Sequence, residues 1–121
     1  MWRGVSVLLL IVGACGSAYP ADFDTEIRPI LQQHCIACHG SKKQEGGLRL
    51  DQRDAALRGG ENYTPAIVPQ SAENSPLWQF VSREDADLKM PPDGAGLSAT
   101  EVQLLKDWID AGAVWPDASA D

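Results

Sequence analysis

The sequence is poor in the side chains from which metal clusters are usually built. Its 121 residues include three cysteines, two histidines and two methionines. Structural zinc takes four protein ligands, so a pair of cysteines three residues apart normally needs a second pair elsewhere. Outside the group formed by Cys35, Cys38 and His39, the chain has only His34 and the N-terminal Cys15 to offer. A structural zinc site is therefore disfavoured.

A redox-active dithiol is disfavoured as well. A thioredoxin-like Cys-x-x-Cys pair belongs in a strand–helix context, and the chain has no apolar–polar alternation long enough to predict a strand. A plain disulfide between Cys35 and Cys38 stays open as an alternative, but it would leave His39 without a function.

Basic residues are scarce. Lysine and arginine number 10 against 17 aspartates and glutamates, which gives a formal net charge of −7. Because phosphate binding needs clustered positive charge, a nucleic acid is not expected as a partner. The acidic surface suits transient docking onto a basic patch of a redox partner protein, although solubility alone explains the same charge.

Long hydrophobic runs are also missing. The mostly apolar stretch over residues 5–14 is too short to span a bilayer as a helix. It follows Arg3 and precedes small residues, which is the layout of a secretory signal. We therefore divide the chain into an export signal over residues 1–21 and one domain over residues 22–121, and we expect an exported, periplasmic protein.

Two ways of processing this signal remain open. Residues 12–15 (Val-Gly-Ala-Cys) resemble a lipobox, in which Cys15 would be acylated and would anchor the protein to a membrane. Residues 16–18 offer small side chains to an ordinary signal peptidase, which would remove Cys15 and release a soluble protein. An unmodified Cys15 would be an odd thiol in an exported chain, which favours the anchor slightly.

The first half of the domain predicts helices separated by long loops. Residues 22–33 follow helical spacing after an acidic cap, and Pro29 should kink this helix or delay its start. A short helix is expected over residues 52–58, ending at Gly59.

The second half predicts two more helices. One opens at Ser75, as a cap, with a proline in its first turn. The clearest helix begins at the capping box of residues 98–101, carries one apolar face and ends at Gly112. The fold class predicted from these patterns is all-α.

The most informative motif is the pentapeptide Cys-Ile-Ala-Cys-His at residues 35–39. This is the spacing of a c-type haem attachment site. The sulfurs of Cys35 and Cys38, on one face of a helical turn, can reach both vinyl groups of one porphyrin, and His39 can ligate its iron. We predict one covalent haem c, which would also bury surface that so small a domain cannot bury alone.

Met90 is the predicted second iron ligand. It is the only methionine left once Met1 and the signal are excluded, and it lies 51 positions after His39. A thioether ligand raises the reduction potential of haem iron, and two prolines after Met90 restrict the backbone there. Lys89 and His34 are the alternative ligands, and the alternative role for a lone methionine is core packing.

Several further residues are predicted to contact the haem. Leu48 and Leu50 alternate around Arg49, so the leucines should face inward and the guanidinium could bind a propionate. Arg53 and Arg58 are alternatives to Arg49, and solvated surface charge is the simpler reading of all three. Other residues expected to pack against haem or in the core are Ile67, Trp78, Trp108 and Trp115.

The haem motif and five flanking segments together resemble the planctomycete-type cytochrome c domain. These segments are residues 24–31, 44–51, 65–69, 88–92 and 108–113. The resemblance covers essentially the whole mature chain. It implies a class I-like cytochrome c fold in which the first and last helices pack together, with Cys35 and Cys38 as thioether links and His39 and Met90 as iron ligands.

The leading functional prediction is a one-electron carrier outside the cytoplasm, without an enzymatic activity of its own. One alternative is a small haem peroxidase or gas-binding sensor in which Met90 dissociates. Another is a haem-stabilised docking module of a larger enzyme. Residues 65–69 and the acidic residues 84–87 are candidate docking surfaces, although haem packing and solvation would explain them as well.

Overall fold

The computed structural model describes residue 4, residues 21–83 and residues 89–116. Within these residues the chain forms helices and no β-strand; an isolated bridge joins His39 and Gln44. The predicted all-α class is confirmed. No helix in the described part of the chain is long and apolar enough to cross a membrane. Cys15 and nearly all of the predicted signal lie outside the described residues.

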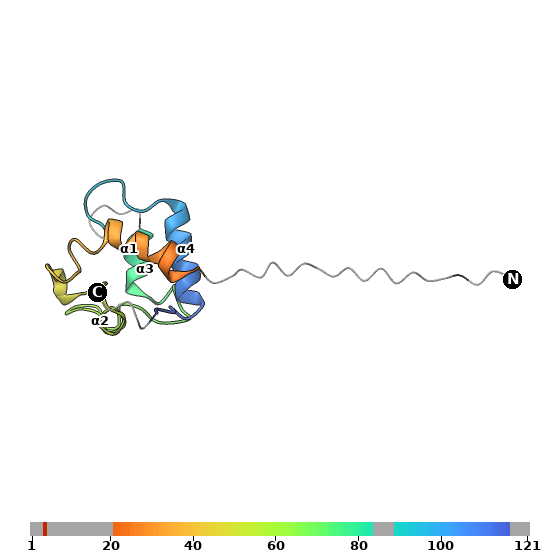
Figure 1. The fold of residues 1–121 in the computed structure, drawn as a ribbon, viewed down its shortest axis with the longest axis horizontal. Helices are drawn as coiled ribbons and strands as arrows, with labels where there is room; N and C mark the ends of the chain where they lie inside the picture. The colour runs from red at the N-terminus through yellow and green to blue at the C-terminus, as the bar shows by residue number, and fades with distance from the viewer. Residues whose placement is uncertain (1–3, 5–20, 84–88, 117–121) are drawn as a thin grey trace.

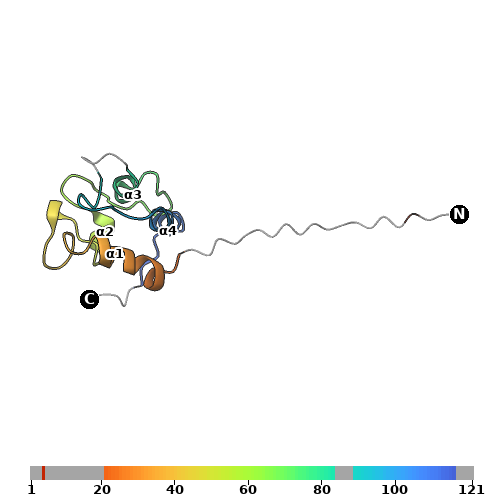
Figure 2. The ribbon, with the colours of Figure 1, turned by 90° about the horizontal axis from the view of Figure 1, so that it is seen from above.

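The first helical segment has the irregular start that its proline predicts. A wide π-helical turn, η1 (Phe23–Ile27), leads into the α-helix α1 (Arg28–His34), and Figure 2 shows them as one continuous orange segment. The carboxylate of Asp22 accepts the Thr25 backbone N–H at 3.1 Å. Pro29 sits in the first turn of α1, directly after the wide turn. The α-helix thus begins later than the helical spacing alone predicts, which agrees with the delayed start that a proline predicts.

The short helix α2 (Arg53–Arg58) follows a 3-10 turn, η2 (Glu45–Gly47), and ends at Gly59 as expected. Helix α3 (Pro76–Val81) also begins where predicted, but Ser75 occupies the cap position without capping the helix. Its hydroxyl donates instead to the carbonyls of Val68 and Ser71 and accepts the Val68 N–H at 2.8 Å. The hydroxyl is fully buried, so it fastens the loop before α3 and the prediction of a side-chain cap is wrong.

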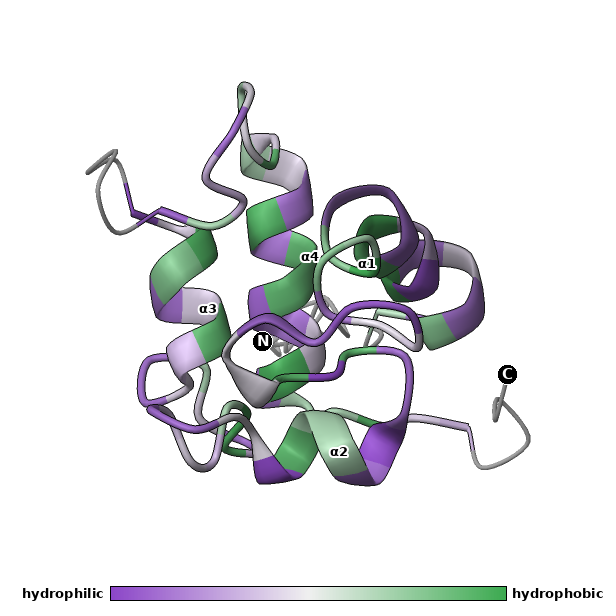
Figure 3. Cartoon of the chain, turned by 90° about the vertical axis from the view of Figure 1, so that its left-hand side faces the viewer, coloured by the Kyte–Doolittle hydropathy of each residue, from purple (hydrophilic) through white to green (hydrophobic). Residues whose placement is uncertain are grey.

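The last helix, α4 (Ala99–Asp110), has both hydrogen bonds of the predicted capping box, and Gly112 follows it with φ +114°. In Figure 3 it stands between α3 and the first helical segment, and α2 lies below these helices in Figures 1 and 3.

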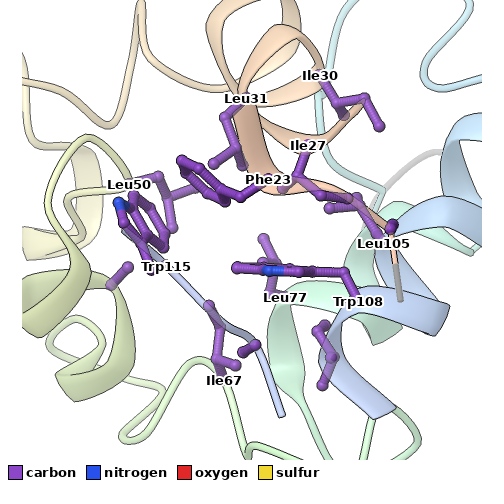
Figure 4. Close-up of a cluster of buried hydrophobic side chains, with 14 of the residues drawn as sticks. Phe23, Ile27, Ile30, Leu31, Leu50, Ile67, Leu77, Leu105, Trp108 and Trp115 are labelled. Carbon is purple, nitrogen blue, oxygen red and sulfur yellow. The ribbon is translucent and has the colours of Figure 1, made fainter. Parts of the chain in front are cut away.

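The core forms where the first and last helices meet, as Figure 4 shows. Phe23 packs against Trp108 and Trp115, with ring centroids 5.7 and 4.5 Å apart. Ile27 and Leu105 are completely buried beside them. The packing of the first and last helices, which the family resemblance implied, is therefore present. Trp108 and Trp115 are core residues, as predicted, whereas Trp78 is only partly buried at the edge.

Candidate functional site

The Cys-x-x-Cys-His motif forms a tight turn at the end of α1. The N–H groups of Cys38 and His39 both donate to the Cys35 carbonyl, at 3.3 and 2.9 Å, which is the helical-turn conformation expected for this spacing. Both cysteines are free thiols, so the disulfide alternative is not formed. The turn therefore presents two neighbouring thiols and an imidazole, which is the donor set for covalent attachment and ligation of a haem.

The two thiols have different surroundings. Cys35 is buried in the hydrophobic core, and Cys38 is half-buried. Burial, assisted by the negative charge of Glu101, raises the pKa of the Cys35 thiol to about 12. Because the thiolate is the reactive form, this burial disfavours the reactive form of a free Cys35 thiol.

His39 is held by its backbone while its ring lacks a partner. The His39 carbonyl accepts the Leu50 N–H at 2.7 Å, and the Cys38 carbonyl accepts the Glu45 N–H at 2.9 Å. Among the described residues, His39 Nδ1 is the one buried side-chain nitrogen or oxygen without a hydrogen-bond partner. Buried polar atoms are nearly always satisfied, so the ring of His39 differs in this respect from an ordinary structural histidine.

In the segment 48–51, the leucines point into the protein and the charged residues lie toward the surface. Leu50 is buried in the core and Leu48 packs against it, as their alternation predicts. The guanidinium of Arg49 binds the carboxylate of Asp51 through two bonds, Nε to Oδ1 at 2.9 Å and Nη2 to Oδ2 at 2.6 Å. These bonds raise the pKa of Arg49 and lower that of Asp51. The residue favoured for a propionate already has a carboxylate partner.

The other predicted haem contacts are placed as follows. Ile67 is buried in the core. Arg53 pairs with Asp54 at 3.3 Å, and Arg58 lies exposed in the last turn of α2. The predicted apolar contacts therefore lie in or against the core, where their contact with haem stays a prediction, while the three arginines face solvent or carboxylates of the protein.

Met90 is a large apolar side chain left partly in solvent. It is 41% exposed, and its backbone N–H donates to the Phe80 carbonyl in α3 at 3.1 Å. The alternative ligands have other partners: Lys89 Nζ donates to the Ala95 carbonyl at 3.2 Å, and His34 Nε2 lies 3.0 Å from Glu101 Oε2 on α4. Met90 therefore does not fill the core, and its role as an iron ligand stays a prediction.

Two aromatic residues near Met90 were not anticipated from the sequence. Tyr63 and Phe80 pack edge to face with centroids 4.8 Å apart, and Tyr63 is 51% exposed. Their separation along the chain leaves no local pattern that would pair them. The only sequence signal is the place of Tyr63, just before the proline-bounded segment 65–69.

Surface hollows do not by themselves mark the site. One of about 330 Å³ lies over the first turns of α4, against Thr100 and Leu104, and another of about 130 Å³ lies between the first helix, Leu50 and Trp115. Neither is lined by His39 or Met90. Among the described residues, no three His, Cys, Asp or Glu side chains lie together as a group that could hold a metal ion.

A small all-α domain whose first helix ends in a Cys-x-x-Cys-His turn belongs to the class of c-type haem domains. Residues 35–94 match the family model described as Planctomycete cytochrome C. The chain therefore carries a planctomycete-type cytochrome c domain, and the resemblance drawn from its motifs is confirmed. Cytochrome c domains bind haem c and transfer electrons. No curated protein and no solved structure gives a significant match to the chain.

Proposed function

We propose that this protein is a one-electron carrier with a single haem c, held in a cytochrome c-like fold and ligated by His39 and Met90. The proposal is carried by two observations, one on each of the proposed iron ligands. A buried imidazole nitrogen without a partner follows the two free thiols, and a partly exposed thioether is fixed at its backbone.

The chain's own residues divide the work. Cys35 and Cys38 would hold the porphyrin through thioether bonds, each formed by adding S–H across a vinyl group, so that nothing is released. Leu48, Leu50 and Ile67 would supply apolar contact from the side of the attachment turn. When bound, the haem supplies an iron that cycles between ferric and ferrous states.

The two ligands set what the iron can do. A soft thioether favours the ferrous state and raises the reduction potential. With both axial positions taken by protein atoms, no open position remains for a substrate. This is why we propose an electron carrier rather than an enzyme.

We further propose that the protein is exported to the periplasm and exchanges electrons with a partner that has a basic docking surface. The motivation is the signal-like residues 1–21 together with the acidic composition: the formal charge of residues 22–121 is −8. Lipid attachment through Cys15 remains the alternative to a freely soluble carrier. The mass of the protein from its own host would report the haem and any acyl chains together.

The test is the optical spectrum of the matured ferric protein. Thioether ligation gives a weak far-red sulfur-to-iron charge-transfer band, and we expect this band in the native protein and its loss in Met90→Ala. Val114→Ala is the matched control because Val114 is also a large exposed apolar residue. A native protein without the band would overturn the Met90 assignment. Pigment that extracts into acidified acetone would overturn covalent attachment.

A gas-binding or peroxidase role is the second candidate, because the partial exposure of Met90 is the one observation that favours a dissociating ligand. Slow, weak carbon monoxide binding to the reduced protein supports the carrier, and rapid binding supports the alternative. In the segment 65–69, which is one candidate surface of the docking module, Ala66 and Ile67 are buried and the two prolines are exposed. Residues 84–87, its other surface, lie outside the described residues.

A further inference from the structure

A backbone hydrogen bond ties Met90 to helix α3. Pro91 and Pro92 carry no N–H, so across residues 90–92 only Met90 can donate from the backbone. That donor is used on the Phe80 carbonyl, at 3.1 Å. Phe80 lies in the last turn of α3, where carbonyls have no intrahelical partner. This bond holds the backbone of Met90 beside the end of α3.

The ring of Phe80 is in turn held by two side chains. Tyr63 packs edge to face with it, at 4.8 Å between centroids and 79° between planes. The guanidinium of Arg83 lies 5.0 Å from the centroid of the same ring. Both arrangements match the charge distribution of an aromatic ring. Tyr63 thus contacts the side chain of the residue whose carbonyl anchors Met90.

Tyr63 itself belongs to a loop that is tied back to the haem attachment turn. The Tyr63 carbonyl accepts the Gly60 N–H at 3.2 Å. The backbone N–H of Glu61, the residue after Gly60, donates to the Gly46 carbonyl at 2.8 Å. Gly60 passes so close to Gly46 that a Cβ at this position would collide with the Gly46 oxygen. Glu45, next to Gly46, donates to the Cys38 carbonyl at 2.9 Å.

These contacts form one continuous series from the attachment turn to the second ligand. It passes from Cys38 through the 44–47 and 59–63 loops to the ring of Tyr63, then to Phe80 and to the backbone of Met90. Tyr63 adds a side-chain contact to the ring of Phe80, while the backbone joins the following loop to α3 through the Leu77 N–H, which donates to the Ala66 carbonyl at 3.0 Å.

We propose that Tyr63 is a positioning residue for Met90, its ring holding Phe80 and with it the ligand segment against the haem. This rests on the proposed function, since it requires Met90 to ligate iron. Without the ring of Tyr63, the Met90 thioether would be dissociated from the iron in a larger fraction of the molecules. An external ligand that competes with Met90 then binds more tightly, because its apparent affinity follows the fraction of molecules with the iron free.

The experiment titrates the matured ferric protein with imidazole and follows the loss of the far-red band. An edge-to-face aromatic pair contributes an energy that converts to about a two- to tenfold change in equilibrium, so Tyr63→Leu should bind imidazole about two- to tenfold more tightly than the native protein. Tyr63→Phe keeps the ring and should bind imidazole as the native protein does. Val114→Ala is the control for losing an exposed apolar group and should also leave the affinity unchanged.

Phe80→Leu provides a second variant, because it keeps the backbone carbonyl that anchors Met90 and removes only the ring. It should shift imidazole affinity in the same direction as Tyr63→Leu. The thermal midpoint is measured in parallel to separate positioning from general stability.

The proposal is overturned if Tyr63→Leu lowers the thermal midpoint without changing imidazole affinity, or if Tyr63→Phe weakens Met90 ligation as much as Tyr63→Leu does. Failure of the underlying function has a different signature. A native protein that lacks the far-red band before any imidazole is added removes Met90 as a ligand, and the positioning role falls with it.

Discussion

Glu101 links the first and last helices of the domain. Replacing it should lower the free energy of unfolding more than is usual for a residue near the surface. Its Oε1 accepts the Ser98 N–H at 3.0 Å, which completes the capping box of α4. Its Oε2 lies 3.0 Å from Nε2 of His34 on α1, 67 positions away in the chain. Glu101→Ala removes both contacts. The bond from the Glu101 N–H to Ser98 Oγ, at 3.1 Å, remains because it uses the backbone.

The expected loss can be built from these two contacts. Half of a capping box contributes about 0.5–1 kcal/mol. The side chains of His34 and Glu101 are 14% and 24% exposed, so their link is screened only in part and contributes about 1 kcal/mol. Glu101→Ala should therefore lower the free energy of unfolding by about 1.5 kcal/mol, which corresponds to roughly 6–12 °C in the thermal midpoint of a domain of this size.

Glu101→Gln is the matched comparison. Glutamine at this position can still accept the Ser98 N–H and can still hydrogen-bond His34, so only the contribution of the charge is lost. We expect a decrease of about 0.5 kcal/mol at neutral pH, well below that of the alanine variant.

The pH dependence follows from the carboxyl group. The hydrogen bond from the Ser98 backbone, helped by His34, holds the pKa of Glu101 below its ordinary value. A carboxyl with a lowered folded-state pKa adds stability above its unfolded-state pKa, and this stability is lost as the pH falls through the folded-state value. The native protein should therefore be more stable than Glu101→Gln at neutral pH, and the difference in stability should decrease as the pH falls.

The assay is thermal unfolding of the haem-loaded protein, followed by far-ultraviolet circular dichroism and by haem absorbance. Val114→Ala measures the background effect of a surface change. The reasoning is refuted if Glu101→Ala unfolds at the same temperature as Val114→Ala. It is also refuted if the difference between the native protein and Glu101→Gln does not decrease toward low pH.

Three further outcomes are expected. The double variant Cys35→Ala/Cys38→Ala should bind no haem covalently. It should be largely unfolded by circular dichroism, because the small core then lacks the apolar surface of the haem. A well-folded, colourless domain would contradict this. Leu105→Ala should lower the free energy of unfolding by about 2–5 kcal/mol in chemical denaturation, since Leu105 is completely buried. Gly112→Ala should cost about 1 kcal/mol in the same assay, because its φ of +114° is poorly accessible to alanine; an unchanged midpoint would show that the backbone relaxes there.

The cofactor chemistry and the helix boundaries could be predicted because short stretches of chain determine them. Cys35, Cys38 and His39 are placed by hydrogen bonds within one turn, and the capping box spans only residues 98–101. The family followed from the order of such local motifs along the chain.

The partners of individual polar side chains could not be predicted in this way. Ser75 was expected to cap α3, but its buried hydroxyl found the carbonyls of Val68 and Ser71 once the loop closed over it. Arg49 was expected to meet a haem propionate, yet the carboxylate of Asp51 occupies its guanidinium. In both cases several groups along the chain could have served equally well as the hydrogen-bond partner. The course of the folded backbone determines which of them lies within reach.

The sequence alone determined which atoms could bind the haem and where the helices begin and end, because hydrogen bonding and backbone freedom over a few residues decide both. Only the tertiary structure paired His34 with Glu101 and brought Tyr63 to Phe80 beside Met90. Such pairs form when distant segments pack against a shared core, and no local preference of either residue specifies the other.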